Sequence, residues 1–497
     1  MRKKLQDLIV LLPNAMVQGK REVLIKDLAH DSRKVIPGTL FVCLSGVKTD
    51  GHDYIMQAYH QGAVAVLVEK DVNNIPEDLT VIKVSDTRAA MMLIAPCFFG
   101  YPSCKLRMIG VTGTNGKTTS TYLIRSIFQE AGFKVGIIGT IQNSIGDKVL
   151  PTQNTTPDVI DLQRLLAQMV EHNMDYVVME VSSHALALNR VAGCEFDVGI
   201  FTNMTRDHLD FHVTFEKYLE AKTKLFQLLG SKAQQKKGKT AIINADDKAA
   251  AFILERTVCK KITYGIEDKV DLQAKNTKIL ANGAQFEVVG PFGIMPLQLK
   301  ITGLFNVYNV LSAVGAALAE GIEAHVIKTS LEKFESVSGR FELIDAGQAF
   351  SVIVDYAHTP DGLENILKTA QQIAQKRIIV VFGCGGDRDK TKRPIMGQLA
   401  VQYGNIVIAT SDNPRTENPE SILNEIETGI KEALTQGKIY EKIIDRRQAI
   451  ERALHLAEAG DIVIIAGKGH ENYQILKDRT ITFDDKEVAK AIIKEMR

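Results

Sequence analysis

The sequence has few of the features that mark secreted, membrane-spanning or nucleic-acid-binding proteins. Its six cysteines lie singly at positions 43, 97, 104, 194, 259 and 384, without a Cys-x-x-Cys pair, so we expect neither a disulfide framework nor a zinc site. The net charge of +1 excludes a general attraction to nucleic acid or to anionic membranes. We therefore expect reduced thiols, a cytoplasmic protein and no nucleic-acid partner.

Long apolar runs are missing as well. The opening MRKKLQDLIVLLP is interrupted by Gln6 and Asp7, and no small-residue cleavage site follows, so we expect no signal peptide. The most apolar window elsewhere, AAMMLIAPCFFG, contains a proline and is shorter than the ~20 residues that a spanning helix needs. We expect no membrane insertion. The composition, 45% hydrophobic and 24% charged over 497 residues, is typical of a soluble globular protein with more than one domain.

Apolar strand-like runs alternate with helical patterns along the whole chain, which predicts an α/β fold. We expect three domains, at residues 1–98, 99–337 and 338–497. The first contains TLFVCL and AVAVLVE; the second contains KVGIIGT, YVVMEVS, VGIFTNM and TAIINAD. These predict a small α/β domain and a central domain with a parallel-rich sheet. The third contains FSVIVDYA, RIIVVFG, NIVIATS and DIVIIAG, which predicts an independent, doubly wound Rossmann-like domain.

A glycine-rich loop, GVTGTNGKTTS, stands between a predicted strand and a predicted helix. It resembles a P-loop, in which backbone amides surround phosphates, the lysine contacts the outer phosphates and the threonine holds Mg²⁺. The full motif requires glycine at position 111, where this chain has Val111, so the loop is a variant. The alternative, a glycine-rich turn with an incidental lysine, is disfavoured by its place between strand and helix. FGCGGDRD does not make the chain a dehydrogenase, because Arg388 stands where the dinucleotide motif needs glycine.

Two acidic and histidine-containing segments are candidates for a metal site. Glu180 ends an apolar strand, where P-loop folds place an acid that meets Mg²⁺. His208 follows another strand beside Asp207 and Asp210, which are able to orient it. The alternatives are a surface glutamate and a histidine that only packs.

The helical segment FEKYLEAKTKLFQLL adds a lysine to these candidates. Its periodicity places Tyr218, Ala221, Leu225 and Leu228 on one face, with Lys222 at the edge. Such a lysine ordinarily extends along the surface to reach water. A bare ammonium opposite a metal site repels Mg²⁺, so a functional Lys222 has to carry the opposite charge.

Taken together, these segments resemble the Mur ligases, and the resemblance covers nearly the whole chain. The motifs that occur in that family's order are GTNGKTT, NTTP, EVSSHAL, DHLDFH, YLEAK, FNVYN, SGRFE, DYAHTP, GGDRDKTKRP, DNPR and GKGHE. The resemblance implies an N-terminal domain for a uridine nucleotide, a central ATPase domain and a C-terminal domain that delivers an amino acid. It is greatest to the members that add meso-2,6-diaminopimelate to the D-glutamate γ-carboxylate of UDP-N-acetylmuramoyl-L-alanyl-D-glutamate in cell-wall precursor synthesis.

The resemblance also implies the site residues. It assigns to ATP the residues Gly113, Thr114, Asn115, Gly116, Lys117, Thr118, Thr119, Asn306, Arg340 and Asp355. It assigns to the muramoyl dipeptide nucleotide the residues Ser32, Asn154, Thr155, Thr156, Ser182 and Arg190. It assigns to diaminopimelate the residues Arg388, Asp412, Asn413, Pro414, Arg415, Gly467 and Glu471. The catalytic set it implies is Lys117, Glu180, His208 and Lys222, the last as a carbamylated lysine, whose carbamate is an anionic oxygen ligand.

Two Mg²⁺ sites are implied, one at Thr118 and Glu180 and one at His208 and carbamylated Lys222. The implied reaction transfers the ATP γ-phosphoryl group to the carboxylate, and an amine then attacks the acyl phosphate. One residue departs from the family's pattern: Leu188 stands where the family often has glutamine. We expect a monomer that acts on small molecules.

Three alternatives stay open within this interpretation. Two are ligases: the form that adds L-lysine, and a folylpolyglutamate synthetase, which shares the ATPase core. DNPR argues against both, and the additional N-terminal domain argues against the second. The third is a UDP-sugar sensor that has lost catalysis, against which the presence of Lys117, Glu180, His208 and Lys222 argues.

Overall fold

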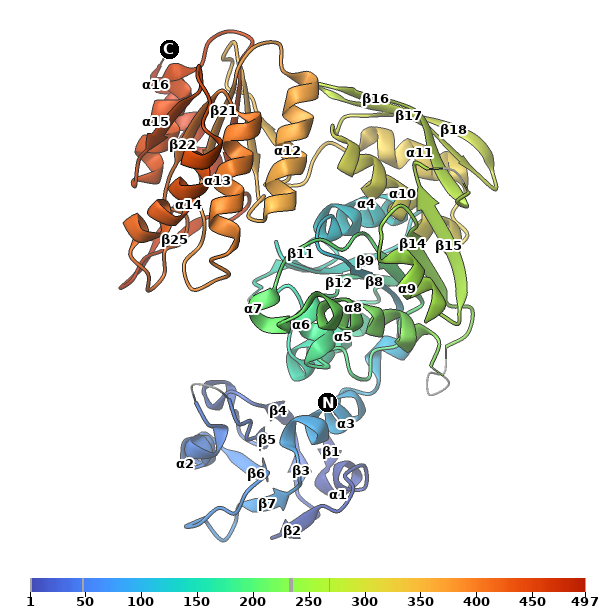
Figure 1. The fold of residues 1–497 in the computed structure, drawn as a ribbon. Coiled ribbons are helices and arrows are strands. Elements are labelled where there is room, and N and C mark those ends of the chain that lie inside the picture. Colours follow the sequence, from blue (N-terminus) through green and yellow to red (C-terminus); the bar gives the residue numbers. More distant parts are fainter. Residues whose placement is uncertain (1, 47–48, 153, 232–235, 268, 497) are drawn as a thin grey trace. The chain divides into compact units, whose positions relative to one another are not determined.

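The computed structural model describes residues 2–46, 49–152, 154–231, 236–267 and 269–496. Contacts between residues divide the chain into two compact units. The first comprises Met1–Gly110, Phe133–Gly199 and Lys224–Thr240, and the second Val111–Gly132, Ile200–Thr223 and Ala241–Arg497. Sheets of five, eleven and six strands carry most of the fold (Figure 1). The predicted α/β class is confirmed, while the predicted boundaries at residues 98 and 337 stay a prediction.

The five-stranded sheet lies in the first unit. Its order is β2 (Met16–Gln18), β7 (Thr80–Lys83), β6 (Ala63–Val68), β5 (Thr39–Val42) and β4 (Asp27–Ala29). All its pairs are parallel except β2 with β7. One face packs against α1 (Leu5–Ile9) and α3 (Thr87–Phe98), and the other against α2 (Ile55–His60), so an apolar cluster forms on each face. TLFVCL and AVAVLVE form β5 and β6, as predicted.

The eleven-stranded sheet contains strands of both units. Its order is β11 (Lys148–Leu150), β10 (Asn143–Ile145), β9 (Val135–Ile138), β12 (Tyr176–Glu180), β8 (Arg107–Thr112), β13 (Val198–Phe201), β14 (Thr240–Asn244), β15 (Lys260–Gly265), β16 (Leu272–Leu280), β17 (Gly283–Gly290) and β18 (Gly293–Leu299). β9 and β12 are parallel. The strands β9–β10–β11 and β16–β17–β18 pair antiparallel, so the sheet is less uniformly parallel than its apolar runs suggest.

The six-stranded sheet lies in the second unit and has the predicted Rossmann-like form. Its order is β19 (Glu342–Ile344), β20 (Ser351–Asp355), β24 (Ile462–Ala466), β21 (Ile378–Phe382), β22 (Ile406–Ala409) and β23 (Ile439–Lys442). All pairs are parallel except β19 with β20. α12 (Pro360–Ile373), α13 (Lys392–Tyr403) and α14 (Pro419–Ala433) cover one face, and α15 (Arg446–Leu456) and α16 (Asp485–Glu495) the other (Figure 1). Fully buried strands explain the uninterrupted apolar runs.

The remaining helices connect the strands. They are α4 (Lys117–Glu130), α5 (Val159–Glu171), α6 (Ser183–Ala187), α7 (Leu209–His212), α8 (Phe215–Leu229), α9 (Ala250–Glu255), α10 (Leu304–Ala319) and α11 (Ala324–Lys333). β25 (Tyr473–Ile475) pairs with β26 (Thr480–Thr482), and β1 (Lys3–Lys4) with β3 (Leu24–Ile25). Within the described residues, no helix combines the length and apolar character needed to cross a membrane.

Candidate active site

The glycine-rich loop joins β8 to α4, as predicted. Gly113 and Gly116 have φ angles of 151° and 84°. A β-carbon on Gly113 would lie 1.9 Å from Thr202 Oγ1, and one on Gly116 would lie 2.3 Å from Asn309 Oδ1. The backbone therefore requires glycine at both positions for space and for conformation. Val111, which departs from the full P-loop motif, is buried inside β8.

Lys117 begins α4 and turns back over the loop. Its ammonium donates hydrogen bonds to the carbonyl oxygens of Gly113 at 2.9 Å and Thr114 at 2.8 Å. Asn115 is held by its backbone N–H, which donates to Asn203 Oδ1 at 2.9 Å. A lysine above a loop at a helix N-terminus is the arrangement that binds phosphate oxygens.

Thr118 lies in the first turn of α4 beside the predicted ATP residue Arg340. Arg340 Nη2 donates to Thr118 Oγ1 at 3.1 Å, and its guanidinium lies 4.6 Å from the centre of the Tyr356 ring. Thr119 is buried in the same turn. The structure thus places the candidate metal ligand Thr118 next to a guanidinium, while Tyr356, which supports that guanidinium, was not predicted.

Lys222 lies deeper than its helical phase suggested. Tyr218, Ala221 and Leu225 are buried as predicted, but Leu228 is only partly buried. Lys222 is 1% exposed and therefore wholly inside the protein, rather than at the edge of the face. Its Nζ lies 4.5 Å from the centre of the Tyr218 ring.

Burial strongly perturbs the charge of Lys222. Loss of water lowers the pKa of its amine well below the usual lysine value, and the positive charge of Lys117 lowers it further. Asp207 and Asp247 act in the opposite direction and do not prevent the shift. A lowered pKa favours the neutral amine, which is the form able to react with carbon dioxide to give a carbamate. This chemistry fits the residue that the family resemblance assigned.

His208 begins the short helix α7 in a left-handed conformation, with φ of 54°. Its Nε2 lies 3.3 Å from Asp207 Oδ2, and its ring lies edge-on to Tyr218 with the centres 6.0 Å apart. Asp210, the second acid expected to orient it, is exposed. The structure therefore supports Asp207 as an orienting acid.

A strained turn follows α7. Val213 has φ 68° and ψ −46°, and the N–H of Thr214 donates to the carbonyl oxygen of His212 at 2.8 Å. These features define a γ-turn of the rare, strained kind, and a β-branched residue there is an outlier. The Val213 side chain is 70% exposed, so it gains little from burial in return.

Glu180 belongs to the first unit, where it ends β12 and is 1% exposed. Its Oε1 accepts from the N–H of Thr140 at 2.9 Å, and its Oε2 accepts from Thr140 Oγ1 at 2.9 Å. Thr140 Oγ1 also lies 3.0 Å from Thr155 Oγ1. Glu180 is thus a buried, oriented carboxylate rather than a surface acid.

The residues predicted for the muramoyl dipeptide lie around the same strand end. Thr156 Oγ1 donates to the Glu180 carbonyl at 2.8 Å, and it accepts from the Ser182 N–H at 3.1 Å. Arg190 Nη1 donates to the Thr156 carbonyl at 3.3 Å. Asn154 is exposed. These polar groups form one strip beside Glu180, as a site for a polar substrate requires.

Ser32, which was also predicted for the dipeptide, and Leu188, which departs from the family's pattern, have other surroundings. Ser32 is buried by the five-stranded sheet, and its Oγ donates to Gln57 Oε1 at 3.0 Å. Leu188 follows α6, and its N–H donates to the carbonyl of His184 at 2.8 Å. Leucine has no polar side-chain atom to offer at this position.

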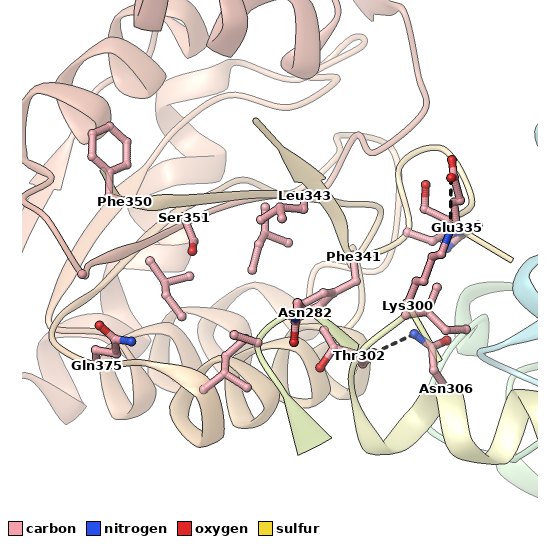
Figure 2. Close-up of a pocket in the computed structure, with 18 of the residues that line it drawn as sticks. Asn282, Lys300, Thr302, Asn306, Glu335, Phe341, Leu343, Phe350, Ser351 and Gln375 are labelled. Atoms are coloured by element: carbon pink, nitrogen blue, oxygen red, sulfur yellow. Dashed lines mark hydrogen bonds and ion pairs between the residues drawn. The ribbon is translucent and has the colours of Figure 1, made fainter. Parts of the chain in front are cut away.

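A cavity of about 390 Å³ lies in the second unit, lined by Asn306 and Arg340 among others (Figure 2). Asn306 Nδ2 donates to the carbonyl of Thr302 at 2.8 Å, and Asn306 Oδ1 accepts from Asn309 Nδ2 at 3.0 Å. Phe341 and Phe350 add aromatic surface. A partly aromatic cavity with a fixed amide suits a planar heterocycle.

Asp355 lies at the end of β20 and binds backbone rather than facing the cavity. Its Oδ2 accepts from the Phe341 N–H at 2.6 Å, and its Oδ1 from the Ala357 N–H at 2.7 Å. Burial raises the pKa of this carboxyl to about 6, although Arg340 and the two N–H groups oppose the rise. With both oxygens engaged, Asp355 holds the segment that carries Arg340.

The segment TSDNPR follows β22, at the same sheet edge as the end of β24. Asp412, Asn413 and Pro414 are buried. Asn413 Nδ2 donates to Glu471 Oε2 at 2.8 Å. Gly467 has φ 117°, and a β-carbon there would lie 3.5 Å from Asp412 Oδ2. The carboxyl ends of parallel strands are where α/β sheets bind ligands.

The two predicted arginines differ in how they are held. Arg415 has φ 53°, and its Nη1 donates to the Gly386 carbonyl at 2.8 Å. A β-carbon on Gly386 would lie 1.9 Å from the Pro414 carbonyl oxygen, so these two loops pack closely. Arg388 is exposed, and its Nη1 donates to the Asp387 carbonyl at 2.9 Å. The structure brings six of the seven predicted residues into contact through these loops and leaves Arg388 at the rim.

Family models match three stretches of the chain. The Mur ligase middle domain matches residues 111–317, the Mur ligase glutamate ligase domain matches 339–469, and the Mur ligase family catalytic domain matches 24–95. A UDP-N-acetylmuramoyl-L-alanyl-D-glutamate--2,6-diaminopimelate ligase of Geobacillus thermodenitrificans is 47% identical over 99% of this chain and all of its own. The chain belongs to the Mur ligase family.

Other Mur ligases agree with this placement. A Clostridium botulinum ligase of the same name is 46% identical over 96% of this chain and 97% of its own. A solved structure of a ligase of that name is 32% identical, with a TM-score of 0.68, over 100% of this chain and 99% of its own. The ADP complex of MurF ligase from Thermotoga maritima is 17% identical with a TM-score of 0.64, over 95% of this chain and 96% of its own, and shows likeness of fold alone.

The metal set that the family resemblance implies has donors of mixed chemistry. Among the residues that the structure describes, no three His, Cys, Asp or Glu side chains gather as a metal cluster. The predicted set instead includes a threonine hydroxyl and a lysine. It therefore depends on Thr118 and on modification of Lys222, and its assignment stays a prediction.

Proposed function

We propose that this Mur ligase joins meso-2,6-diaminopimelate to the D-glutamate γ-carboxylate of UDP-N-acetylmuramoyl-L-alanyl-D-glutamate, with ATP as co-substrate. The assignment of diaminopimelate as the amino-acid substrate rests on the loop after β22. Buried Asp412 and Asn413 lie with Glu471, close to the half-buried guanidinium of Arg415. An acceptor whose distal end has both an ammonium and a carboxylate meets acids and a guanidinium there. Lysine has only the ammonium.

The phosphate chemistry is assigned to the loop before α4. Lys117 exchanges its bonds to the Gly113 and Thr114 carbonyls for phosphate oxygens, and the loop N–H groups surround those oxygens. We assign the adenine to the cavity of Figure 2, which Asn306 lines. The γ-phosphoryl group passes to the substrate carboxylate, the amine attacks the acyl phosphate, and phosphate leaves.

Thr118 and a carbamate on Lys222 offer the oxygen ligands that Mg²⁺ prefers, and His208 adds a ring nitrogen. Thr118 would be a ligand of one ion, and His208 with carbamylated Lys222 would be ligands of a second; when bound, the ions neutralise charge that develops on the phosphoryl oxygens. Burial lowers the pKa of the Lys222 amine and so favours its neutral form, which carbamylation requires. Asp207 keeps the His208 ring in place.

The alternatives are distinguished by one assay. Phosphate release is measured with ATP, Mg²⁺ and the dipeptide nucleotide, adding meso-diaminopimelate, L-lysine or no amino acid. We expect release with diaminopimelate and little with lysine. A sensor and a folate-type ligase both release none in these mixtures. A further mixture with a folate and glutamate separates them, because only the folate-type ligase releases phosphate there. We further propose that the enzyme works as a monomer in the bacterial cytoplasm, on small molecules alone.

A further inference from the structure

Lys468 is buried among the residues predicted to bind diaminopimelate, although the family resemblance does not assign it to that site. Lys468 follows Gly467 in GKGHE, and its side chain is 0% exposed. Its Nζ donates to Asn413 Oδ1 at 3.2 Å and to Glu471 Oε2 at 3.1 Å. A buried ammonium is costly unless it is paired and hydrogen-bonded, and here both conditions are met by residues of the amino-acid site.

The bonds of Lys468 close a small network. Asn413 Oδ1 also accepts from the Ile475 N–H at 2.9 Å, while Asn413 Nδ2 donates to the same Glu471 oxygen that Lys468 reaches. The lysine therefore fixes which way the Asn413 amide and the Glu471 carboxylate point. Because they are fixed before a ligand arrives, less ordering entropy is lost on binding.

One acceptor in this group has no donor. Asp412 Oδ1 is buried and accepts no hydrogen bond from the described residues. The Lys468 ammonium lies 3.6 Å away, beyond hydrogen-bond distance. Asp412 and Glu471 supply two negative charges and Lys468 one positive charge, so these three side chains leave one negative charge for a ligand ammonium, while Arg415 beside them leaves one positive charge for a ligand carboxylate. The unused Asp412 oxygen is an acceptor for that ammonium.

We propose that Lys468 is a positioning residue of the amino-acid site: its ammonium fixes the Asn413 amide and the Glu471 carboxylate in the orientation that the distal end of the substrate meets. This inference rests on the proposed function. It assigns recognition of the distal ammonium to the Lys468 network and leaves the distal carboxylate to Arg415.

The test compares Lys468→Met, which keeps the length of the side chain and removes its charge, with the wild type. The substrates are meso-diaminopimelate and 2-aminopimelate, which keeps the distal carboxylate and lacks the distal ammonium. For diaminopimelate we expect the Michaelis constant to rise about tenfold to a hundredfold, the range expected on loss of charged hydrogen bonds. The Michaelis constants of ATP and the dipeptide nucleotide should stay within about twofold of the wild-type values, because Lys468 bonds to residues of the amino-acid site.

The decisive quantity is the ratio of kcat/KM for diaminopimelate to that for 2-aminopimelate. We expect Lys468→Met to reduce this ratio about tenfold or more, because only diaminopimelate uses the ammonium position. A lysine that merely supports the fold lowers both values by the same factor and leaves the ratio unchanged. An unchanged ratio overturns the proposal.

Lys438→Met is the matched control. Lys438 donates to the Gln402 carbonyl at 2.9 Å and precedes β23, at the opposite end of the parallel strands from the loop after β22. We expect its ratio to equal that of the wild type. Lys468→Gln, whose amide still donates one hydrogen bond, is the second variant if Lys468→Met does not melt cooperatively. Failure of both to fold assigns Lys468 to the scaffold and overturns the inference.

The two proposals fail in different ways. If the wild-type enzyme does not use diaminopimelate, the proposed function is wrong whatever the variants do. If the wild type uses diaminopimelate and Lys468→Met has the same ratio, only the role of Lys468 is wrong.

Discussion

Replacement of Lys222 by methionine should separate activity from stability. The side chain is 1% exposed, and burial together with Lys117 lowers the pKa of its amine. A lysine whose pKa is lowered by folding binds fewer protons in the folded state than in the unfolded state. The lysine therefore lowers the free energy of unfolding at neutral pH, and stability is regained as the pH rises toward the unfolded pKa of roughly 10.4.

The size of this effect follows from the same linkage. As long as the amine is neutral in the folded state, each pH unit below the unfolded pKa lowers the free energy of unfolding by about 1.4 kcal/mol. Methionine of similar length removes that cost and keeps the packing against Tyr218. We expect Lys222→Met to raise the free energy of unfolding by about 1 to 4 kcal/mol at pH 7, the range seen when buried charged groups are replaced by apolar groups of similar size. The comparison is made without carbon dioxide or Mg²⁺, so that Lys222 of the wild type carries no carbamate, and the gain should shrink at higher pH.

Activity should change in the opposite direction. Without a carbamate, the second ion loses an anionic ligand, and loss of one stabilising group in a transition state commonly costs a factor of about 10² to 10³ in kcat. The assays are urea unfolding at several pH values and phosphate release with all three substrates. Added acetate should restore part of the activity of Lys222→Ala by occupying the vacated space.

The control is Lys217→Met, an exposed lysine of the same helix, which should leave both activity and stability unchanged. If Lys222→Met retains wild-type turnover, the carbamate role is wrong. If it unfolds at lower urea concentration than the wild type, the lowered pKa of the Lys222 amine is wrong.

Three further variants test other parts of the site. Asn306→Ala should raise the Michaelis constant of ATP about tenfold, because a cavity-lining amide is lost; an equal rise for all three substrates would indicate a scaffold residue. Arg415→Ala should reduce the kcat/KM preference for diaminopimelate over lysine by about a hundredfold with unchanged ATP affinity, and an unchanged preference would contradict the assignment. Val213→Gly should raise the free energy of unfolding by about 1 kcal/mol, because relief of the γ-turn strain exceeds the added chain entropy. Val213→Ala, which keeps a β-carbon at positive φ, should gain less; equal gains would show that the turn is not strained.

The sequence predicted the parts of the fold that depend on local pattern. Uninterrupted apolar runs identified β5, β6, β20, β21, β22 and β24, because strands buried on both faces need apolar residues throughout. Glycines and a lysine identified the phosphate loop for a reason visible in the structure: a β-carbon at Gly113 or Gly116 meets other atoms. The antiparallel strands β16–β18 alternate buried and exposed residues and were not predicted.

What could not be predicted depends on contacts between distant residues. The helical phase of α8 placed Lys222 at the edge of the buried face, while packing from other elements encloses it completely. Lys468 stands in a predicted motif, but its role depends on Asn413, 55 residues earlier. Asp355 was expected to bind ATP, and its bonds to Phe341 and Ala357 appear only once β20 is placed beside the segment that carries Arg340.

The central claim is that this Mur ligase selects an amino acid with two charged groups at its distal end. The most direct measurement offers the wild-type enzyme equal concentrations of meso-diaminopimelate and L-lysine, with ATP, Mg²⁺ and the dipeptide nucleotide, and identifies the products by mass spectrometry. We predict the diaminopimelate product in excess by a factor of about 10³ or more, because lysine leaves Arg415 without its carboxylate. Equal amounts of both products, or an excess of the lysine product, would contradict the account.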